Sequence, residues 1–245
     1  MARTNEFGQP IGVEMAGWTI RPRPSRAPME GRHCRVEPLD ADRHAAQLFD
    51  AWNETADGRD WTYKFAEPPA DLASCRAFVE KESASLDPLH FAIVDAATGA
   101  AIGSAALMRI DPVHGVIEVG GIAYSQRLKR TRAGTEAMYL FMRRVFDELG
   151  YRRYEWKCDD LNAPSRAAAL RYGFAYEGTF RQAIVYKGRN RDTAWFSMLD
   201  SEWPRVRAAL EEWLADDNFD SAGRQRRALA MIRGPSSSTS TRPIP

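Results

Sequence analysis

The segment from Tyr154 to Asp200 constrains the fold most, because three kinds of secondary-structure signal follow one another closely within it. Tyr154, Trp156 and Cys158 alternate with charged residues, which is the period of a half-buried strand. Asn162 can cap a short helix over Pro164–Tyr172, and Gly173 follows the last helical position. Two further strand-like runs then make a hairpin, so this segment predicts a sheet packed against at least one helix.

The same signals recur along most of the chain. Helices are predicted after Asp40, after Asp71 and over Arg132–Leu149, Pro164–Tyr172 and Ser201–Leu214. Strands are predicted at His33–Leu39, His90–Asp95, Ala101–Ile110, Gly115–Tyr124, Tyr151–Cys158, Ala175–Lys187 and Thr193–Leu199, with the last turn at Gly188-Arg189-Asn190. Strands first and then β-α-β-α-β-β predict an α/β (α+β) fold, in which a mixed central sheet carries helices on both faces.

The two ends of the chain differ from this pattern in composition. Residues 1–30 are rich in Gly, Pro and Arg, with Trp18 as the one large anchor, and are expected to form an extended arm with disorder before Gly8. Residues 216–245 turn polar and end in PSSSTSTRPIP, which predicts a disordered tail. The sequence therefore predicts one folded domain over residues 31–215.

Composition excludes several classes of protein. A net charge of +1 gives no global attraction to nucleic acid or to an anionic membrane. No apolar run reaches the roughly 20 residues of a membrane span, and the first residues lack the apolar core of a signal peptide. Cys34, Cys75 and Cys158 are too widely spaced for a disulfide framework or a zinc site. A cytoplasmic protein is expected, with neither nucleic acid nor membrane among its partners.

The quoted segment resembles the GNAT N-acetyltransferases, in particular the RimJ/RimL-like branch. The motifs that carry the resemblance are Asn162-Ala-Pro-Ser165, Gly173-Phe174, Glu177-Gly178, Arg191-Asp192 and Ser201-Glu202-Trp203-Pro204. The resemblance extends from about Asn5 to Leu214 and implies the GNAT fold, a mostly antiparallel sheet whose two central parallel strands splay apart in a V. It also implies acetyl-CoA as co-substrate and no metal.

In this family the pyrophosphate of acetyl-CoA lies on backbone amides of a loop that opens a long helix, where unpaired N–H groups and the helix dipole attract phosphate. The corresponding segment here reads Lys129, Arg130, Thr131, Arg132, Ala133 and Gly134, followed by Thr135. Gly134 matches a small position of the family pattern, but Arg132 stands where the family has glycine. Cationic side chains are expected to replace part of the backbone cradle; the alternative is a merely solvated basic loop.

The start of the short helix is the second donor element that the resemblance implies. Asn162 would bond the pantetheine amides, and Ser165 would give a proton to the leaving thiolate. The structural alternative makes Asn162 an ordinary N-cap and Ser165 a first-turn residue. The tyrosine acid that many family members carry is Ala169 here, and Tyr172 is not its equivalent.

The implied reaction is direct attack of a primary amine on the thioester carbonyl. Neutralising a lysine-like amine at pH 7 costs roughly 4–5 kcal/mol, whereas an α-amine costs only about 1 kcal/mol. Backbone N–H groups near Ile122, Ala123 and Tyr124, where the strand splays, are expected to bind the donor and stabilise the oxyanion. Glu118 is the candidate base, acting through water; strand alternation alone would equally place it on a solvent face. One type of protein in this branch has a second glutamate base in the strand after Glu177-Gly178, and the matching position here is Ile184.

Trp61 and Tyr63 lie in a loop that can border the acceptor site, although aromatic loops more often belong to the core. Arg191 and Asp192 would form either a structural ion pair or a substrate contact. The four histidines have no metal or triad spacing.

The sequence thus predicts an acetyl-CoA-dependent N-acetyltransferase acting on a small-molecule amine or a protein N-terminal α-amine. The rival prediction is a non-catalytic GNAT-like module that binds CoA or a metabolite. The sequence leaves open whether the protein is a monomer or a homodimer.

Overall fold

A computed structural model describes residues 3–55 and 57–234. Its centre is an eight-stranded sheet with the order β3-β4-β5-β6-β7-β8-β10-β9. Neighbouring strands are antiparallel except β7 and β8, which are parallel and lie at the middle of the sheet. The predicted mixed sheet is therefore confirmed.

The elements follow one another in nearly the predicted order. The strands are β1 Arg3–Thr4, β2 Pro10–Ile11, β3 Met29–Glu30, β4 Cys34–Pro38, β5 Leu89–Asp95, β6 Ala101–Asp111, β7 Val116–Tyr124, β8 Arg153–Asp159, β9 Ala175–Tyr186 and β10 Arg189–Leu199. The helices are α1 Ala41–Trp52, α2 Leu72–Ala84, α3 Arg132–Arg143, α4 Ala163–Tyr172, α5 Trp203–Leu214 and α6 Leu229–Arg233, with short helical turns at Arg59–Trp61, Arg144–Glu148 and Asp216–Asn218.

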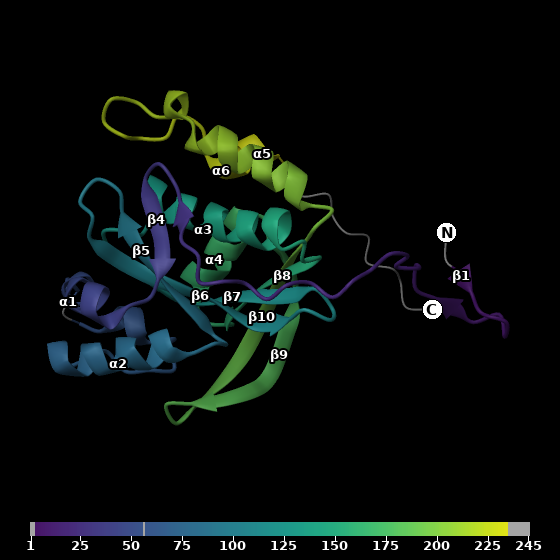
Figure 1. Cartoon of the computed structure of the whole chain (residues 1–245), viewed down its shortest axis with the longest axis horizontal. Helices are drawn as coiled ribbons and strands as arrows, with labels where there is room; N and C mark the ends of the chain where they lie inside the picture. Colours follow the sequence, from purple (N-terminus) through teal and green to yellow (C-terminus); the bar gives the residue numbers. More distant parts are fainter. Residues whose placement is uncertain (1–2, 56, 235–245) are drawn as a thin grey trace.

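Helices cover both faces of the sheet, as Figure 1 shows: α1 and α2 lie below it, and α3, α4 and α5 lie above it. The core above the sheet is made by alternate residues of β7 and β8, including Ile117, Val119 and Trp156, packed on α3 and α5. The smaller core below it joins α1 and α2 to β5 and β6. Two apolar layers around one sheet are what the alternating strands demand.

Local sequence explains where the helices begin. The Asp40 side chain accepts a hydrogen bond from the Arg43 N–H and caps α1, and Asp71 and Ser74 form a reciprocal capping box at α2. The predicted long helix after Arg132 is α3, but its last turn over residues 144–148 is π-helical, with the Leu149 N–H reaching the Arg144 carbonyl at 3.0 Å.

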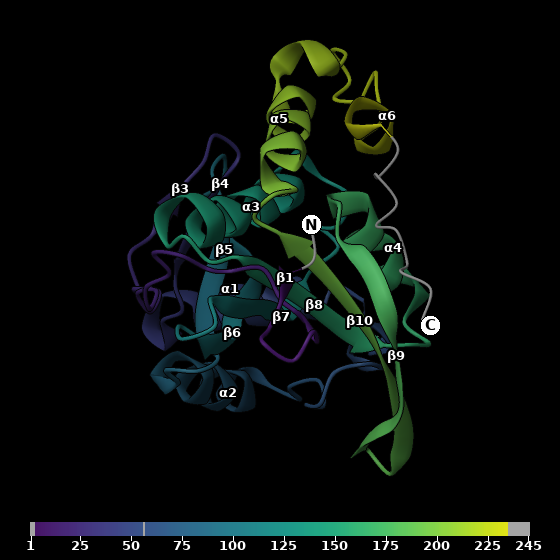
Figure 2. The ribbon, with the colours of Figure 1, turned by 90° about the vertical axis from the view of Figure 1, so that its right-hand side faces the viewer.

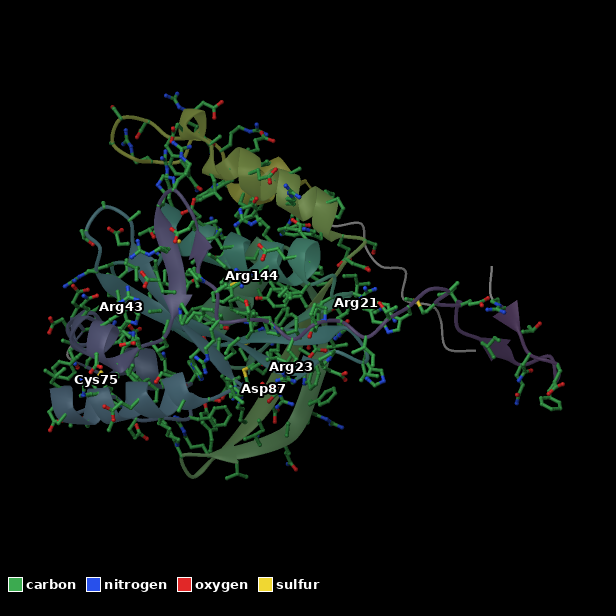
Figure 3. All side chains as sticks on the ribbon, viewed as in Figure 1. Arg21, Arg23, Arg43, Cys75, Asp87 and Arg144 are labelled. Carbon is green, nitrogen blue, oxygen red and sulfur yellow. The ribbon has the colours of Figure 1, made fainter. Side chains whose placement is uncertain are left out.

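From Trp18 onward the N-terminal arm runs along the domain as an extended segment. The Trp18 indole donates to the Val113 carbonyl at 3.0 Å, and the Arg21 guanidinium stacks on the Trp18 ring at 4.3 Å. Arg144 of the π-helical turn donates to the carbonyls of residues 27 and 28, so this segment is tied to α3 at its far end (Figure 3). The expected disorder before Gly8 differs from the structure, in which Arg3–Thr4 pairs with Pro10–Ile11.

The C-terminal segment also differs from its prediction. Residues 216–234 do not form a disordered tail; they fold back beside α5, and Figure 2 shows α6 running next to it. Phe219 packs edge-on against Trp213, and Leu229 is buried in the main core. The prediction rested on the polar composition of the segment, whereas these two apolar side chains attach it to the rest of the domain. The rest of the predicted tail, residues 235–245, lies outside the described residues.

The last two strands form a long hairpin that projects below the body of the domain (Figure 2). Its turn comes at Lys187 and Gly188, one or two residues earlier than predicted, because both residues take the left-handed conformation that a tight turn needs. The tip of the hairpin touches the loop between α1 and α2: Lys187 donates to the Trp61 carbonyl at 3.0 Å and Arg189 to the Thr62 carbonyl at 2.8 Å.

Candidate functional site

The parallel strands β7 and β8 separate in the middle of the sheet. They pair from Val116 with Arg153 to Val119 with Trp156, and no pairing continues beyond that point. An extra residue in β7 causes the change: Gly121 has φ of +58° within a β-bulge, and a side chain on Gly120 would meet the Met108 sulfur at 2.2 Å. The two glycines therefore create the V-shaped opening that the fold places between the central strands.

The start of α3 lies at this opening, on the upper face. Thr131 caps the helix, accepting from the Gly134 N–H at 3.0 Å and donating to the Leu128 carbonyl at 2.8 Å. A Cβ on Gly134 would lie 2.4 Å from the Leu128 carbonyl oxygen, so only glycine fits this predicted small position. Because the cap satisfies the Gly134 amide, the first-turn amides of Arg132 and Ala133 are left to an external acceptor.

The cationic side chains predicted around this loop already have carboxylate partners. Lys129 pairs with Asp60 at 2.6 Å, and Arg127 pairs with Glu54. Arg132 contacts Asp216 at 3.3 Å, and its guanidinium lies 3.4 Å from the centre of the Phe219 ring. Arg130 is exposed and takes a left-handed φ of +61°. The loop is thus ringed by cations, and a phosphate would replace an internal carboxylate there.

We expect Arg132→Ala to weaken acetyl-CoA binding about tenfold, because a charge-assisted hydrogen bond to phosphate is worth roughly 1.5–3 kcal/mol. The free energy of unfolding should fall by no more than about 1 kcal/mol, the usual value of an exposed cation–π contact. Titration calorimetry measures the affinity. Arg143→Ala, at the far end of α3, is the matched control. An unchanged affinity would remove Arg132 from the donor site.

Other residues predicted to bind the donor support the loop or strand. The Tyr124 hydroxyl donates to the Gly134 carbonyl at 3.1 Å, and so does that of Tyr172, a residue not predicted to bind the donor, at 3.3 Å. Thr135 donates to the Thr131 carbonyl at 3.2 Å. Two carbonyls of the splayed strand accept from side chains of the lower layer: that of Ile122 from Lys64 at 3.2 Å, and that of Ala123 from the Trp52 indole at 3.0 Å.

The start of α4 faces the same opening from β8. Asn162 is the N-cap, and its side chain accepts from the Ser165 N–H at 3.1 Å. The Ser165 hydroxyl accepts from the Trp156 indole at 3.0 Å. Trp156 is the last residue of β8 that pairs with β7. The cap therefore places Ser165 directly above the point where the strands part.

Glu118 lies on the opposite face of the sheet at nearly the same level, since its neighbours Ile117 and Val119 point into the upper core. It is buried and pairs with Lys157 at 2.8 Å and with Arg109 at 3.2 Å. Burial raises the pKa of Glu118, and the two cations limit that rise. A buried carboxylate with a raised pKa can accept a proton near neutral pH more readily than an exposed one.

The loop between α1 and α2 covers this lower face of the opening. Trp61 packs edge-on against Trp52 and belongs to the lower core. Tyr63 reaches across to the turn between β8 and α4, where its hydroxyl donates to the Leu161 carbonyl at 3.1 Å. Of the two predicted acceptor residues, Trp61 therefore serves packing, and Tyr63 lies at the opening.

Two polar features of this face were not predicted. Lys64 is half-buried beside the Trp61 ring, and burial lowers its pKa to about 7. His90 of β5 contacts Glu82 of α2 at 2.6 Å and lies against Gly121 of the bulge. A lysine between two aromatic residues was the available sequence signal for the first; the His90–Glu82 pair depends on a helix meeting a strand and leaves no local signal.

Within residues 3–55 and 57–234, no cluster of histidine, cysteine, aspartate and glutamate could hold a metal ion. In the same part of the chain, no helix combines the length and the apolar character needed to span a membrane.

Comparison with known proteins gives concordant matches. A family model described as an acetyltransferase (GNAT) domain matches residues 34–175. A crystal structure of a GCN5-related N-acetyltransferase from Brucella melitensis is 52% identical, has a TM-score of 0.88, and covers 89% of this chain and 99% of its own. A probable GNAT-family acetyltransferase from Chromobacterium violaceum is 39% identical, with a TM-score of 0.74 and coverage of 80% and 97%.

A curated relative points to the same branch. It is the Bacillus subtilis (strain 168) protein YdaF, named provisionally as a ribosomal N-acetyltransferase. The two chains are 26% identical over 172 residues, which are 69% of this chain and 90% of the relative.

Proposed function

This chain belongs to the GNAT acetyltransferase family, in its RimJ/RimL-like branch, and is an N-acetyltransferase. From this we propose that acetyl-CoA donates its acetyl group directly to a primary amine, which is bound on the lower face of the β7–β8 opening. The observation that carries the proposal is the placement of Ser165 and Glu118. They flank the last paired position of the two strands from opposite faces, Ser165 through Trp156 and Glu118 through its neighbour Val119.

The donor fits the upper face. The amides at the start of α3 and the cations around them suit the pyrophosphate, and Gly134 keeps the helix start close to the loop. Asn162, at the start of α4, would bond the pantetheine arm while its oxygen caps the helix. These residues bind and orient the donor so that its thioester lies between the separated strands.

The amine loses a proton and its nitrogen attacks the thioester carbonyl, forming the C–N bond and a tetrahedral oxyanion. In this scheme Glu118 takes the first proton through water, and backbone N–H groups near Ile122 and Ala123 hold the oxyanion. The oxyanion collapses with cleavage of the C–S bond, and the Ser165 hydroxyl gives a proton to the departing thiolate. The second proton lost by the nitrogen restores the Ser165 hydroxyl through water, and Glu118 releases its proton to solvent.

The acceptor is a small-molecule amine or a protein N-terminal α-amine. An α-amine is neutralised near pH 7 at a cost of only about 1 kcal/mol, which matches one carboxylate base held between two cations. The likeness to a relative named for ribosomal acetylation supports the protein N-terminus as one of the two candidates.

The first test is titration of the purified protein with acetyl-CoA, followed by a screen of amine acceptors for release of free thiol. Micromolar donor binding together with acceptor-dependent thiol release would support the proposal. Donor binding without thiol release for any acceptor would favour the rival, a non-catalytic CoA-binding module. No binding at millimolar donor would reject the donor site.

Ser165→Ala should lower the turnover number about tenfold and leave donor affinity within about twofold. The loss is smaller than general acid catalysis usually gives, because a thiolate with a pKa near 8.5 is already a good leaving group. Steady-state kinetics and calorimetry separate the two effects. Ser83→Ala, on the exposed side of α2, serves as control. An unaltered turnover number would reject the proton-donor role.

A further inference from the structure

Arg191 of β10 is buried to 7% exposure without an anionic partner. Its Nε has no hydrogen-bond partner, and no carboxylate within the described residues forms an ion pair with it. The neighbouring Asp192, with which the sequence suggested a pair, instead accepts from the Gln182 N–H at 2.7 Å and the Asn190 amide at 2.9 Å. A buried guanidinium without a counter-charge costs free energy unless something else neutralises it.

Two other buried cations, by contrast, have carboxylate partners. Lys157 has both Glu118 and Glu155, at 2.8 and 2.7 Å. Arg144 has Glu148 and two backbone carbonyls. Each of these two cations therefore has an anionic partner.

Lys64 and Arg233, which have no carboxylate partner in the part of the chain that the structure describes, donate to backbone carbonyls instead, at 3.2 and 3.0 Å. Within the described residues the Arg191 side chain has neither kind of partner, so an external anion can take that place.

The surroundings of Arg191 place it beside the acceptor side of the opening. Its guanidinium lies 4.9 Å from the centre of the Phe65 ring, which belongs to the α1–α2 loop, and 5.7 Å from that of Tyr186. The Tyr186 hydroxyl donates to Asp159 at 2.7 Å, and Asp159 is the last residue of β8, beyond the point where β8 leaves β7. Two aromatic rings thus orient the guanidinium at the edge of the opening.

Further donors without partners continue along β10. The Thr193 hydroxyl and the Trp195 indole nitrogen are buried and unbonded. Trp195 pairs with Lys157 in register, and the Lys157 ammonium lies 3.8 Å from its ring, so Trp195 is on the face that carries Glu118. Between Arg191 and Thr193 the pairing with β9 shifts register, with the extra residues on β9. The unbonded donors of Trp195 and Thr193 therefore lie along β10 between the face that carries Glu118, the candidate base, and Arg191.

We propose that Arg191 binds a carboxylate of the acceptor, so that the amine substrate of this enzyme carries a carboxylate near the amine that is acetylated. A guanidinium matches a carboxylate with two parallel hydrogen bonds, which fixes direction as well as distance. The proposal rests on the proposed acetyl transfer and narrows its substrate class. The carboxylate can come from a free amino acid or from an acidic residue at a peptide N-terminus.

The test uses product-like probes, whose binding does not require turnover. N-acetylalanine is compared with N-acetylalanine amide, and N-acetyl-Glu-Ala amide with N-acetyl-Gln-Ala amide, by calorimetry on the full chain with and without CoA. We expect the carboxylate member of one pair to bind about 10- to 100-fold more tightly, the range of a charge-assisted hydrogen bond. The first pair reports a free amino acid, and the second an acidic N-terminus.

Arg191→Gln should abolish this preference, and Arg191→Lys should retain part of it, because an ammonium keeps the charge but not the bidentate geometry. Arg181→Gln, which removes an exposed cation from β9, should leave it unchanged. Melting temperatures confirm that each variant is folded. Equal affinities within both pairs, including no measurable binding, would overturn the proposal. In that case acceptor amines without a carboxylate would still give thiol release, and the proposed acetyl transfer would stand.

Discussion

Glu118→Gln should lower the turnover number about 100-fold, the low end of what a general base contributes. Glutamine keeps the shape of the side chain but cannot take up a proton. Burial raises the pKa of Glu118 above its ordinary value of 4.5, and the base works only when ionised. The wild-type rate should therefore fall as the pH drops through that raised pKa, and this acidic limb should be absent from the pH–rate profile of the variant.

Glu155→Gln is the matched control for this experiment. Glu155 lies directly opposite Glu118 in the register of β7 and β8, is equally buried, and shares Lys157 with it. Each variant removes one negative charge from the same buried group and leaves Lys157 one carboxylate. If Glu155→Gln is impaired as strongly as Glu118→Gln, the effect belongs to the charge network and Glu118 is not the base.

Glu136→Ala should reduce the free energy of unfolding by roughly 3–5 kcal/mol, because it leaves three buried or part-buried N–H groups without an acceptor. The carboxylate of Glu136, on α3, accepts from the backbone of Arg32, His33 and Cys34, at 2.9, 2.6 and 2.8 Å. It thereby joins α3 to the turn before β4. A side chain on Gly31 would meet this carboxylate at 2.4 Å, which shows how closely the turn is packed.

Urea unfolding followed by fluorescence measures the loss. Glu80→Ala, which breaks an exposed pair with Arg76, should cost less than about 1 kcal/mol. A loss for Glu136→Ala no larger than that of the control would mean that water replaces the carboxylate at the turn.

Local patterns in the sequence predicted much of the fold. Alternation in β8 and the caps at Asp40, Asp71 and Asn162 depend on neighbouring residues, and the structure confirms them. The prediction of disorder was wrong for residues 216–234, because Phe219 and Leu229 pack on α5 and the main core, which no local window of sequence reveals.

The candidate site likewise combines features that neighbouring residues predict with features that depend on residues distant in sequence. The loop at Gly134 and the helix start at Ser165 belong to motifs contiguous in sequence. The surroundings of Lys64 and of Arg191 arise from segments that are distant in sequence and meet only in the folded chain. Lys64 meets the Ile122 carbonyl, 58 residues away, and Arg191 meets the ring of Phe65 in the α1–α2 loop. Side-chain charge is visible in a sequence, whereas the presence of its partner is not.

The carboxylates around the α3 loop have a consequence for how the donor affinity responds to ionic strength. Lys129 and Arg132 are neutralised internally by Asp60 and Asp216, so phosphate would exchange with side chains and release few mobile counterions. Acetyl-CoA affinity should then change little between low and physiological salt, which calorimetry at several salt concentrations would detect. Because Asp60 belongs to the α1–α2 loop and Gln126 also holds it at 3.1 Å, the arriving phosphate would loosen the cover over the acceptor side, which favours ordered binding with the donor first.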